Sequence, residues 1–253
     1  MKSASTSRNA GRLAVLPDGL SAIRVGGFQP FTTLDYPGQM AAVVFLQGCP
    51  LRCVYCHNPD LLPVRADTEI DGREIEARLK ERRGLLQAVV FSGGEPLVQS
   101  GLAAAMDHVR SLGFKVGLHT SGISPDRFQR LRDRVDWVGF DIKAPFSGYG
   151  GVTGVSQAGR RAEASFAMLA AWGIPYEVRV TIWPSLIDCE AVRQIATEVH
   201  RLGCKDFALQ ECRDPATGEA MGGAAFLDDD LQADLAQSFP GFAVRRASHA
   251  RAA

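Results

Sequence analysis

Short apolar runs alternate with amphipathic stretches along most of the chain, and this alternation constrains the fold more than any other feature. Six runs of five to eight residues are rich in Val, Ile, Leu and Phe and indicate buried strands. They cover residues 40–47, 88–92, 114–119, 137–142, 176–182 and 206–210. Strands that are apolar along their whole length are buried on both faces, so the alternation predicts a parallel sheet covered by helices.

Helix signals stand between these strands. Asp71 is a candidate N-cap, Ser124-Pro125 supplies a cap and a first-turn proline, and Gly113 suits the position after a helix. We predict helices over 69–83, 97–112 and 189–202, one that opens at 124–125 and one that ends near 173. Residues 147–159 are rich in glycine and predict a loop. The pattern leaves open whether the sheet closes into a barrel.

The length of 253 residues fits one larger α/β domain, and no linker, composition break or repeat divides the chain. We therefore predict a single domain over residues 21–246, a disordered tail over 1–20 and a frayed end over 247–253. A transit peptide is the alternative for the tail, which lacks the apolar core of a secretory signal. No apolar run approaches the roughly 20 residues that span a bilayer, so we expect a cytoplasmic protein.

The charge balance excludes two kinds of partner, and the cysteine content excludes one kind of scaffold. The 28 basic side chains balance 28 acidic ones, so the chain has no net positive charge with which its whole surface could attract nucleic acid or an anionic membrane. We expect neither as a partner. Six cysteines are too few for a disulfide-built scaffold of this length.

Polar or glycine-rich residues stand at the ends of five successive predicted strands. They are Gly48-Cys49, Gly93-Gly94-Glu95-Pro96, His119-Thr120-Ser121-Gly122, Asp141-Ile142-Lys143, and Arg179 with Thr181. Ligands bind at the carboxyl ends of parallel strands, so these residues predict one active site at that edge. We expect a carboxylate partner for Arg179, with an exposed strand face as the alternative. We place Asp141 and Lys143 on opposite faces, with a solvent-exposed ion pair as the alternative.

Three of the six cysteines, Cys49, Cys53 and Cys56, have the spacing C-x3-C-x2-C. Thiolates this close repel one another unless a metal shares their charge. A structural zinc site normally has four ligands, and only His57 stands nearby as a fourth. Three thiols on one loop fit better a [4Fe–4S] cluster that leaves one iron open. A zinc loop, or three unrelated thiols, is the alternative.

With the aromatic Tyr55 before the last cysteine, this spacing resembles the signature of the radical S-adenosylmethionine superfamily. Other segments narrow the likeness: LDYPG at 34–38, CHNP at 56–59, SGGEP at 92–96, Thr120-x-Gly122 and DIKAP at 141–145. Together they resemble the glycyl-radical-enzyme activating enzymes, above all the activating proteins of the anaerobic ribonucleoside-triphosphate reductase. The likeness covers roughly residues 23–210.

The resemblance implies a fold and a set of site residues. The fold would be a partial (β/α)6 barrel of parallel strands with outer helices. Cys49, Cys53 and Cys56 would bind the [4Fe–4S] cluster, as their spacing also suggests. Tyr55 is expected to contact S-adenosylmethionine at the adenine, and Gly93, Gly94 and Glu95 at the methionine amino group. One or both of Asp141 and Lys143 would contact the ribose or carboxylate region, and Arg179 the methionine carboxylate. Thr120 is expected to bind the same cofactor. For Tyr55 the alternative is packing within the loop, and for Gly93–Glu95 an ordinary turn.

His119 and the three remaining cysteines do not belong to the motifs above. His119 departs from the resembled pattern, which has an acidic residue near a monovalent cation at this position, and neutral imidazole is a poor ligand for such an ion. We therefore do not expect a cation site of that form. The other cysteines, Cys189, Cys204 and Cys212, are widely spaced and are predicted to be apolar packing residues.

The resemblance also implies a reaction. A low-potential donor such as flavodoxin or ferredoxin would reduce the cluster, and S-adenosylmethionine would be cleaved to methionine and a 5′-deoxyadenosyl radical. That radical would take a hydrogen atom from a glycine Cα of a partner enzyme, and we expect residues 35–38 to shape the mouth where the partner's loop enters. The alternatives are a radical S-adenosylmethionine enzyme that modifies a small molecule or nucleoside, and a non-catalytic zinc-binding adaptor.

Overall fold

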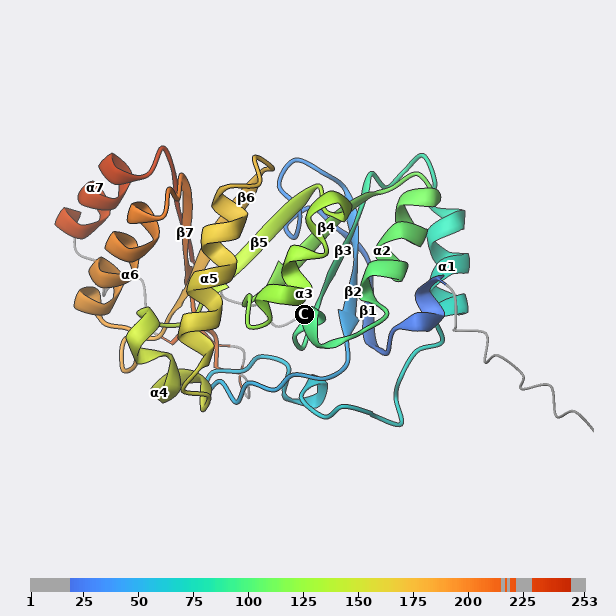
Figure 1. Ribbon diagram of the computed structural model, residues 1–253, viewed down its shortest axis with the longest axis horizontal. Coiled ribbons are helices and arrows are strands. Elements are labelled where there is room, and N and C mark those ends of the chain that lie inside the picture. The colour runs from blue at the N-terminus through green and yellow to red at the C-terminus, as the bar shows by residue number, and fades with distance from the viewer. Residues whose placement is uncertain (1–18, 215–216, 218, 222–228, 247–253) are drawn as a thin grey trace, which may run out of the picture.

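The computed structural model describes residues 19–214, 217, 219–221 and 229–246. Its centre is one sheet of eight strands that follow one another in chain order (Figure 1). The strands are β1 (Val25–Thr32), β2 (Ala41–Leu46), β3 (Ala88–Gly93), β4 (Lys115–Thr120), β5 (Trp137–Ile142), β6 (Tyr176–Ile182), β7 (Asp206–Glu211) and β8 (Gly241–Arg245). Strand β1 runs antiparallel to β2, and every later neighbour is parallel.

The predicted α/β fold with a partial barrel of parallel strands and outer helices is confirmed, and the six predicted strands correspond to β2–β7. The linear strand order leaves β1 and β8 at the two edges, so the barrel is open. Both edge strands were missed. The sequence of β1, VGGFQPFT, contains two glycines and a proline, which weaken the strand signal and are tolerated at a sheet edge.

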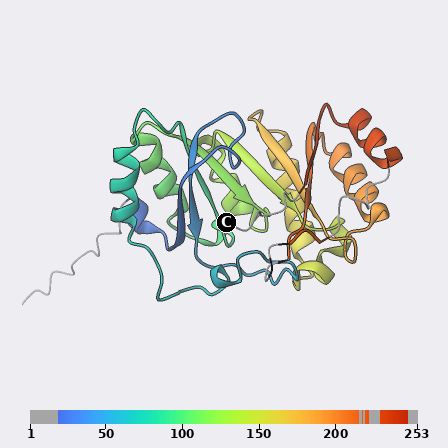
Figure 2. The same cartoon turned by 180° about the vertical axis from the view of Figure 1, so that it is seen from behind.

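Helices cover the outer face of this sheet in Figure 1, and Figure 2 shows the molecule from behind. The helices are α1 (Gly72–Glu81), α2 (Leu102–Ser111), α3 (Pro125–Gln129), α4 (Tyr149–Thr153), α5 (Ala158–Ala170), α6 (Cys189–Arg201) and α7 (Asp229–Ser238), of which α4 lies below the others in Figure 1. The N-cap prediction is confirmed, because the Asp71 carboxylate accepts a hydrogen bond from the Arg73 amide at 2.9 Å. Helix α2 begins five residues later than predicted, because Pro96–Val98 forms a separate 3-10 helix, η3.

The predicted tails fall mostly outside the described residues. Residues 1–18 and 247–253 are not described, so the predictions for these segments stay predictions. Gly19 and Leu20, at the end of the predicted N-terminal tail, already belong to a 3-10 helix, η1 (Gly19–Ala22), and Leu20 is fully buried. Among the described residues, no helix is both long and apolar enough to cross a membrane.

The inner face of the sheet changes character from one end to the other. At the amino ends of the strands, Val43, Val90 and Trp137 belong to a small apolar cluster that also contains Tyr36 from the β1–β2 connection. The rings of Tyr36 and Trp137 lie 5.3 Å apart between centroids. At the carboxyl ends the same face carries polar side chains: Ser92, His119, Asp141, Arg179, Thr181 and Gln210. The apolar cluster therefore closes the barrel beneath a polar chamber.

Candidate active site at the carboxyl ends of the strands

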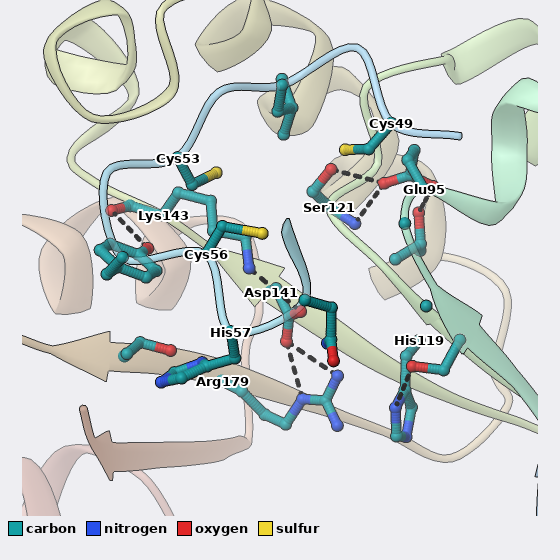
Figure 3. A pocket seen from close by; sticks show the side chains of 18 of the residues that line it. Cys49, Cys53, Cys56, His57, Glu95, His119, Ser121, Asp141, Lys143 and Arg179 are labelled. Carbon is teal, nitrogen blue, oxygen red and sulfur yellow. Dashed lines mark hydrogen bonds and ion pairs between the residues drawn. The ribbon is translucent and has the colours of Figure 1, made fainter. Parts of the chain in front are cut away.

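A cavity of about 330 Å³ lies at the carboxyl ends of the parallel strands (Figure 3). Its lining comes from the loop after β2 and from the ends of β3, β4, β5, β6 and β7. All eleven predicted site residues line it: Cys49, Cys53, Tyr55, Cys56, Gly93, Gly94, Glu95, Thr120, Asp141, Lys143 and Arg179. The prediction that these strand ends converge is confirmed, and their individual roles stay predictions.

The three neighbouring cysteines lie on a loop, residues 48–63, that we call the cysteine loop. Its two ends meet, since the Gly48 amide donates to the Leu61 carbonyl at 2.8 Å and the Cys49 amide to the Leu62 carbonyl at 3.1 Å. Its middle is tied to α4, where the Arg52 amide donates to the Thr153 carbonyl at 2.8 Å. The prediction of a loop throughout 147–159 is therefore wrong, because this segment contains the short helix that supports the cysteines.

The thiols of Cys49, Cys53 and Cys56 are partly buried and face the cavity (Figure 3). Burial, and then the nearby Glu95 carboxylate, raises the pKa of Cys49 to about 12, and burial also raises the pKa of Cys53. Among the described residues, no group of three or more His, Cys, Asp or Glu side chains is gathered to hold one metal ion. In a [4Fe–4S] cluster each thiolate binds a different iron, and three soft sulfur donors on one loop suit that group.

Tyr55 fixes the cysteine loop to the neighbouring strand end. Its ring is 3% exposed, and its hydroxyl donates to the Lys143 carbonyl at 3.4 Å. The Lys143 amide in turn donates to the Tyr149 hydroxyl at 3.1 Å, which links α4 to the same point. Tyr55 thus has a structural contact and also lines the cavity, and its contact with an adenine ring stays a prediction.

Gly93 and Gly94 bring the turn after β3 against the backbone of the cysteine loop. The Gly94 amide donates to the Leu46 carbonyl at 2.9 Å, and the Glu95 amide to the Gly48 carbonyl at 3.0 Å. A Cβ on Gly94 would lie 2.4 Å from the Gly48 oxygen, and Gly93 has a φ of +103°. Glycine is therefore required at this turn because a neighbouring segment of the chain approaches it closely. Gly93 and Gly94 also line the cavity.

The Glu95 carboxylate, 2% exposed, joins the ends of β3 and β4. Its Oε1 accepts from the Thr120 hydroxyl at 2.6 Å and from the Leu97 amide at 3.1 Å. Its Oε2 accepts from the Ser121 amide at 2.9 Å and from the Ser121 hydroxyl at 2.5 Å. Burial raises the pKa of Glu95, and these four donors oppose the rise because they favour the ionised form.

Asp141, Lys143 and Arg179 form one ionic group on the inner face (Figure 3). Asp141 Oδ1 lies 2.8 Å from Arg179 Nε, and Oδ2 lies 3.2 Å from Lys143 Nζ. The expected carboxylate partner of Arg179 is thus Asp141, and the exposed-face alternative is wrong, since the Arg179 side chain is 10% exposed. Our placement of Asp141 and Lys143 on opposite faces is also wrong, because residues two apart in a strand point the same way.

The charges of this group are unequal, with two cations on one carboxylate. Burial opposes ionisation of Asp141, yet Arg179 and Lys143 outweigh it and lower the pKa of Asp141 to about 2. The pKa of Lys143 is raised, because the attraction of Asp141 exceeds the cost of burial. The floor of the cavity therefore carries a net positive charge that suits an anionic ligand group.

His119 is buried beside this group and holds two polar contacts. Its Nε2 lies 2.8 Å from the Asp35 carbonyl, and its Nδ1 lies 3.2 Å from the Ser92 hydroxyl. A carbonyl only accepts, so Nε2 carries the proton and Nδ1 accepts from Ser92. Burial, with the nearby Arg179 cation, lowers the pKa of His119 to about 3. The side chain is thus neutral at physiological pH.

This neutral histidine predicts an acid sensitivity of stability. The unfolded chain takes up a proton at His119 near pH 6.5, whereas the folded chain does so only near pH 3, so stability falls as the pH falls between these values. From pH 7 to pH 5 we expect the wild type to lose about 2 kcal/mol more than His119→Gln. Urea unfolding at each pH measures the difference. Parallel losses in the two proteins would contradict a neutral, buried imidazole.

Gln210 lines the cavity although the sequence analysis gave it no role, whereas Asp35, Ser92 and Asn58 belong to segments that the resemblance had already singled out. Gln210 is a single polar residue outside any motif, and only its inward-facing parity on β7 gave a signal. The segment 35–38 was expected at the mouth, yet it connects β1 to β2 at the amino ends of the strands and reaches the cavity from below, through Asp35.

Cys204 and Cys212 are buried, as their prediction as packing residues requires, while Cys189 is only partly buried. Cys212 has a further contact, since its Sγ lies 3.8 Å from Nε2 of His57 on the cysteine loop. The same nitrogen lies 3.0 Å from the Arg213 carbonyl. The segment after β7 therefore holds one side of the cysteine loop.

Sequence comparisons agree with this arrangement. A model of the Radical SAM superfamily matches residues 43–188, more than half of the chain. A Methanocaldococcus jannaschii protein whose name describes a glycyl-radical enzyme activating enzyme is 28% identical over 195 residues, which cover 74% of this chain and 79% of that protein. The pyruvate formate-lyase-activating enzyme of Clostridium pasteurianum is 29% identical over 187 residues, which cover 71% of this chain and 77% of that protein.

A solved structure shows the same fold. SuiB of Streptococcus suis, crystallised with its precursor peptide SuiA, superposes with a TM-score of 0.63 at 13% sequence identity. The superposition covers 80% of this chain and 48% of SuiB, so the chain spans about half the length of that protein. At this identity the likeness concerns the fold alone.

Proposed function

This chain belongs to the radical S-adenosylmethionine superfamily, and from that premise we propose that it is an activating enzyme that generates a glycyl radical on a partner enzyme. Enzymes of the superfamily use a [4Fe–4S] cluster and S-adenosylmethionine. The observation that carries the proposal is the cavity itself, where the C-x3-C-x2-C loop faces the ends of five neighbouring strands. The names of the two relatives, both activating enzymes, support the choice of a protein substrate.

The proposed ligands of the cluster are Cys49, Cys53 and Cys56, which leave one iron open for S-adenosylmethionine. When bound and reduced, the cluster supplies the electron that cleaves S-adenosylmethionine to methionine and a 5′-deoxyadenosyl radical. The chain's own residues bind the reactants, orient them and exclude water. The proposed contacts to S-adenosylmethionine are Tyr55, Gly93, Gly94, Glu95, Thr120, Asp141, Lys143 and Arg179.

The charges of the cavity walls support these proposed contacts to S-adenosylmethionine. Lys143 and Arg179 share one counter-ion, Asp141, so the methionine carboxylate meets a net positive charge beside the cysteine loop. At the other side, Glu95 accepts four hydrogen bonds from its own chain, which holds the Gly93–Glu95 turn rigid. The opposite charges of these two walls match a zwitterionic amino acid group.

The proposed partner is the anaerobic ribonucleoside-triphosphate reductase, with a low-potential donor such as flavodoxin or ferredoxin as the source of electrons. The sequence segments at 34–38, 56–59 and 141–145 support this partner by resemblance. Pyruvate formate-lyase is the competing partner, because one relative is named for it.

Electron paramagnetic resonance tests the proposal. The reconstituted protein is mixed anaerobically with dithionite, S-adenosylmethionine and either the reductase or pyruvate formate-lyase from the same organism. We expect a glycyl doublet in the reductase. A doublet only in pyruvate formate-lyase would replace the partner, and formation of 5′-deoxyadenosine without a doublet in either protein would favour an enzyme acting on a small molecule or nucleoside.

A further inference from the structure

Two glutamine side chains are buried behind the cysteine loop, outside the lining of the cavity. Gln47, directly after β2, is 1% exposed, and Gln99, directly after η3, is 4% exposed. A buried amide is costly unless its donors and acceptor are hydrogen-bonded. The contacts of these two side chains therefore indicate what they hold.

Gln47 joins the start of the cysteine loop to its end. Its Nε2 donates to the Asp60 carbonyl at 2.9 Å and to the Pro63 carbonyl at 2.8 Å. Both partners only accept, so the orientation of the amide is fixed. Its Oε1 is buried with no hydrogen-bond partner among the described residues. The side chain thus makes its hydrogen bonds through its two N–H groups, and both donate to the last residues of the cysteine loop.

Gln99 joins Gln47 to the turn after β3. Its Nε2 donates to the Gln47 carbonyl at 2.9 Å and to the Arg24 carbonyl at 2.8 Å, and its Oε1 accepts from the Arg24 amide at 2.8 Å. Only η3 separates Gln99 from the Gly93–Glu95 turn. Hydrogen bonds of Gln47 and Gln99 therefore connect the end of the cysteine loop to η3, which directly follows that turn.

We propose that Gln47 and Gln99 are positioning residues that set the placement of the cysteine loop relative to the Gly93–Glu95 turn, and through it the affinity for S-adenosylmethionine. The inference rests on the proposed function, in which the cysteine loop and the turn bind two parts of the same small molecule. Loading of the cluster requires only the three thiols of one loop. Binding of S-adenosylmethionine requires both segments in register, so it is the more sensitive to their relative placement.

Gln47→Met and Gln99→Met test this role, because methionine keeps the volume and removes the amide. Iron and sulfide are measured after anaerobic reconstitution, and the dissociation constant of S-adenosylmethionine is measured by equilibrium dialysis on the oxidised holoenzyme. We expect wild-type iron and sulfide contents and a dissociation constant raised about tenfold in both variants.

Two control variants separate positioning from general stability. Gln87→Met removes the side-chain oxygen Oε1, which accepts a hydrogen bond from the Met40 backbone amide at 2.6 Å. This contact lies at the amino ends of β2 and β3. Val109→Ala opens a cavity in the core beneath α2, where Val109 is fully buried, away from the network. Both controls are expected to bind S-adenosylmethionine as the wild type does.

Unchanged affinity in both methionine variants would overturn the inference, and so would equal weakening in Val109→Ala. If a variant does not retain the cluster, amide hydrogen exchange of the cluster-free chains decides. Faster exchange of the Gly48 and Cys49 amides in the variants, with unchanged exchange in β5, supports positioning, whereas wild-type exchange at Gly48 and Cys49 overturns it. A wild-type holoenzyme that fails to bind S-adenosylmethionine would overturn the proposed function instead, and the exchange comparison still tests the two amides.

Discussion

Cys53→Ala is expected to abolish cleavage of S-adenosylmethionine, whereas Cys204→Ala keeps it. Cys53 lines the cavity between two other thiols, and its loss leaves two protein ligands for a cluster that needs three. Cys204 is 4% exposed and donates to the Asp206 carbonyl at 3.5 Å, in the connection before β7. We expect 5′-deoxyadenosine production, measured by chromatography, to fall at least about a hundredfold in Cys53→Ala.

Iron and sulfide analysis of the same two proteins provides the control. Cys53→Ala is expected to lose most of its iron, and Cys204→Ala to match the wild type. Equal loss of activity and iron in the two variants would contradict the division of the six cysteines into three that bind the cluster and three that pack elsewhere.

Asp141→Asn is expected to lower the free energy of unfolding by about 3 kcal/mol, because it leaves two partly buried cations without a counter-ion. The side chains of Asp141, Lys143 and Arg179 are 27%, 17% and 10% exposed. Glu163→Gln is the matched control, since it removes the carboxylate of an exposed pair with Arg201 and is expected to cost less than about 1 kcal/mol. Urea unfolding at pH 7 measures both.

The pH dependence of this difference has a defined sign. Arg179 and Lys143, against the opposing effect of burial, lower the pKa of Asp141 to about 2 from 3.8. The stability that ionised Asp141 contributes is therefore complete above about pH 4 and is lost as the pH falls through 2. The gap between wild type and Asp141→Asn is expected to be constant from pH 5 to pH 8. A gap that narrows within that range would contradict the ionic role of Asp141.

Sequence patterns predicted the parallel part of the sheet because β2 to β7 are rich in apolar residues and follow the βα repeat. They missed β1 and β8, whose identity as strands depends on pairing with a neighbour along one edge. They also missed α4, since Tyr149–Thr153 contains two glycines and is stabilised by contacts with the cysteine loop. Long-range pairing thus decided the elements that local propensity does not specify.

The candidate site was more predictable than its internal contacts. Position at a strand end predicted most of the eleven residues that line the cavity, because parallel strands place their carboxyl ends together, whereas Cys53, Tyr55 and Cys56 were predicted from the cysteine spacing and the resemblance. The partners of each side chain depend on distances that the sequence does not encode locally. Gln47 and Gln99 show this limit, since the Gln99 side-chain amide donates to the backbone carbonyl of Gln47, 52 residues earlier in the chain.

The central claim is that the cysteine loop holds a [4Fe–4S] cluster whose open iron receives S-adenosylmethionine in this cavity. Its most direct test is the electron paramagnetic resonance spectrum of the dithionite-reduced holoenzyme, recorded as S-adenosylmethionine is added. We predict the signal of a reduced [4Fe–4S] cluster that shifts to a new, saturable form on addition. A colourless protein that contains zinc and no sulfide, or a cluster signal unaffected by S-adenosylmethionine, would contradict it.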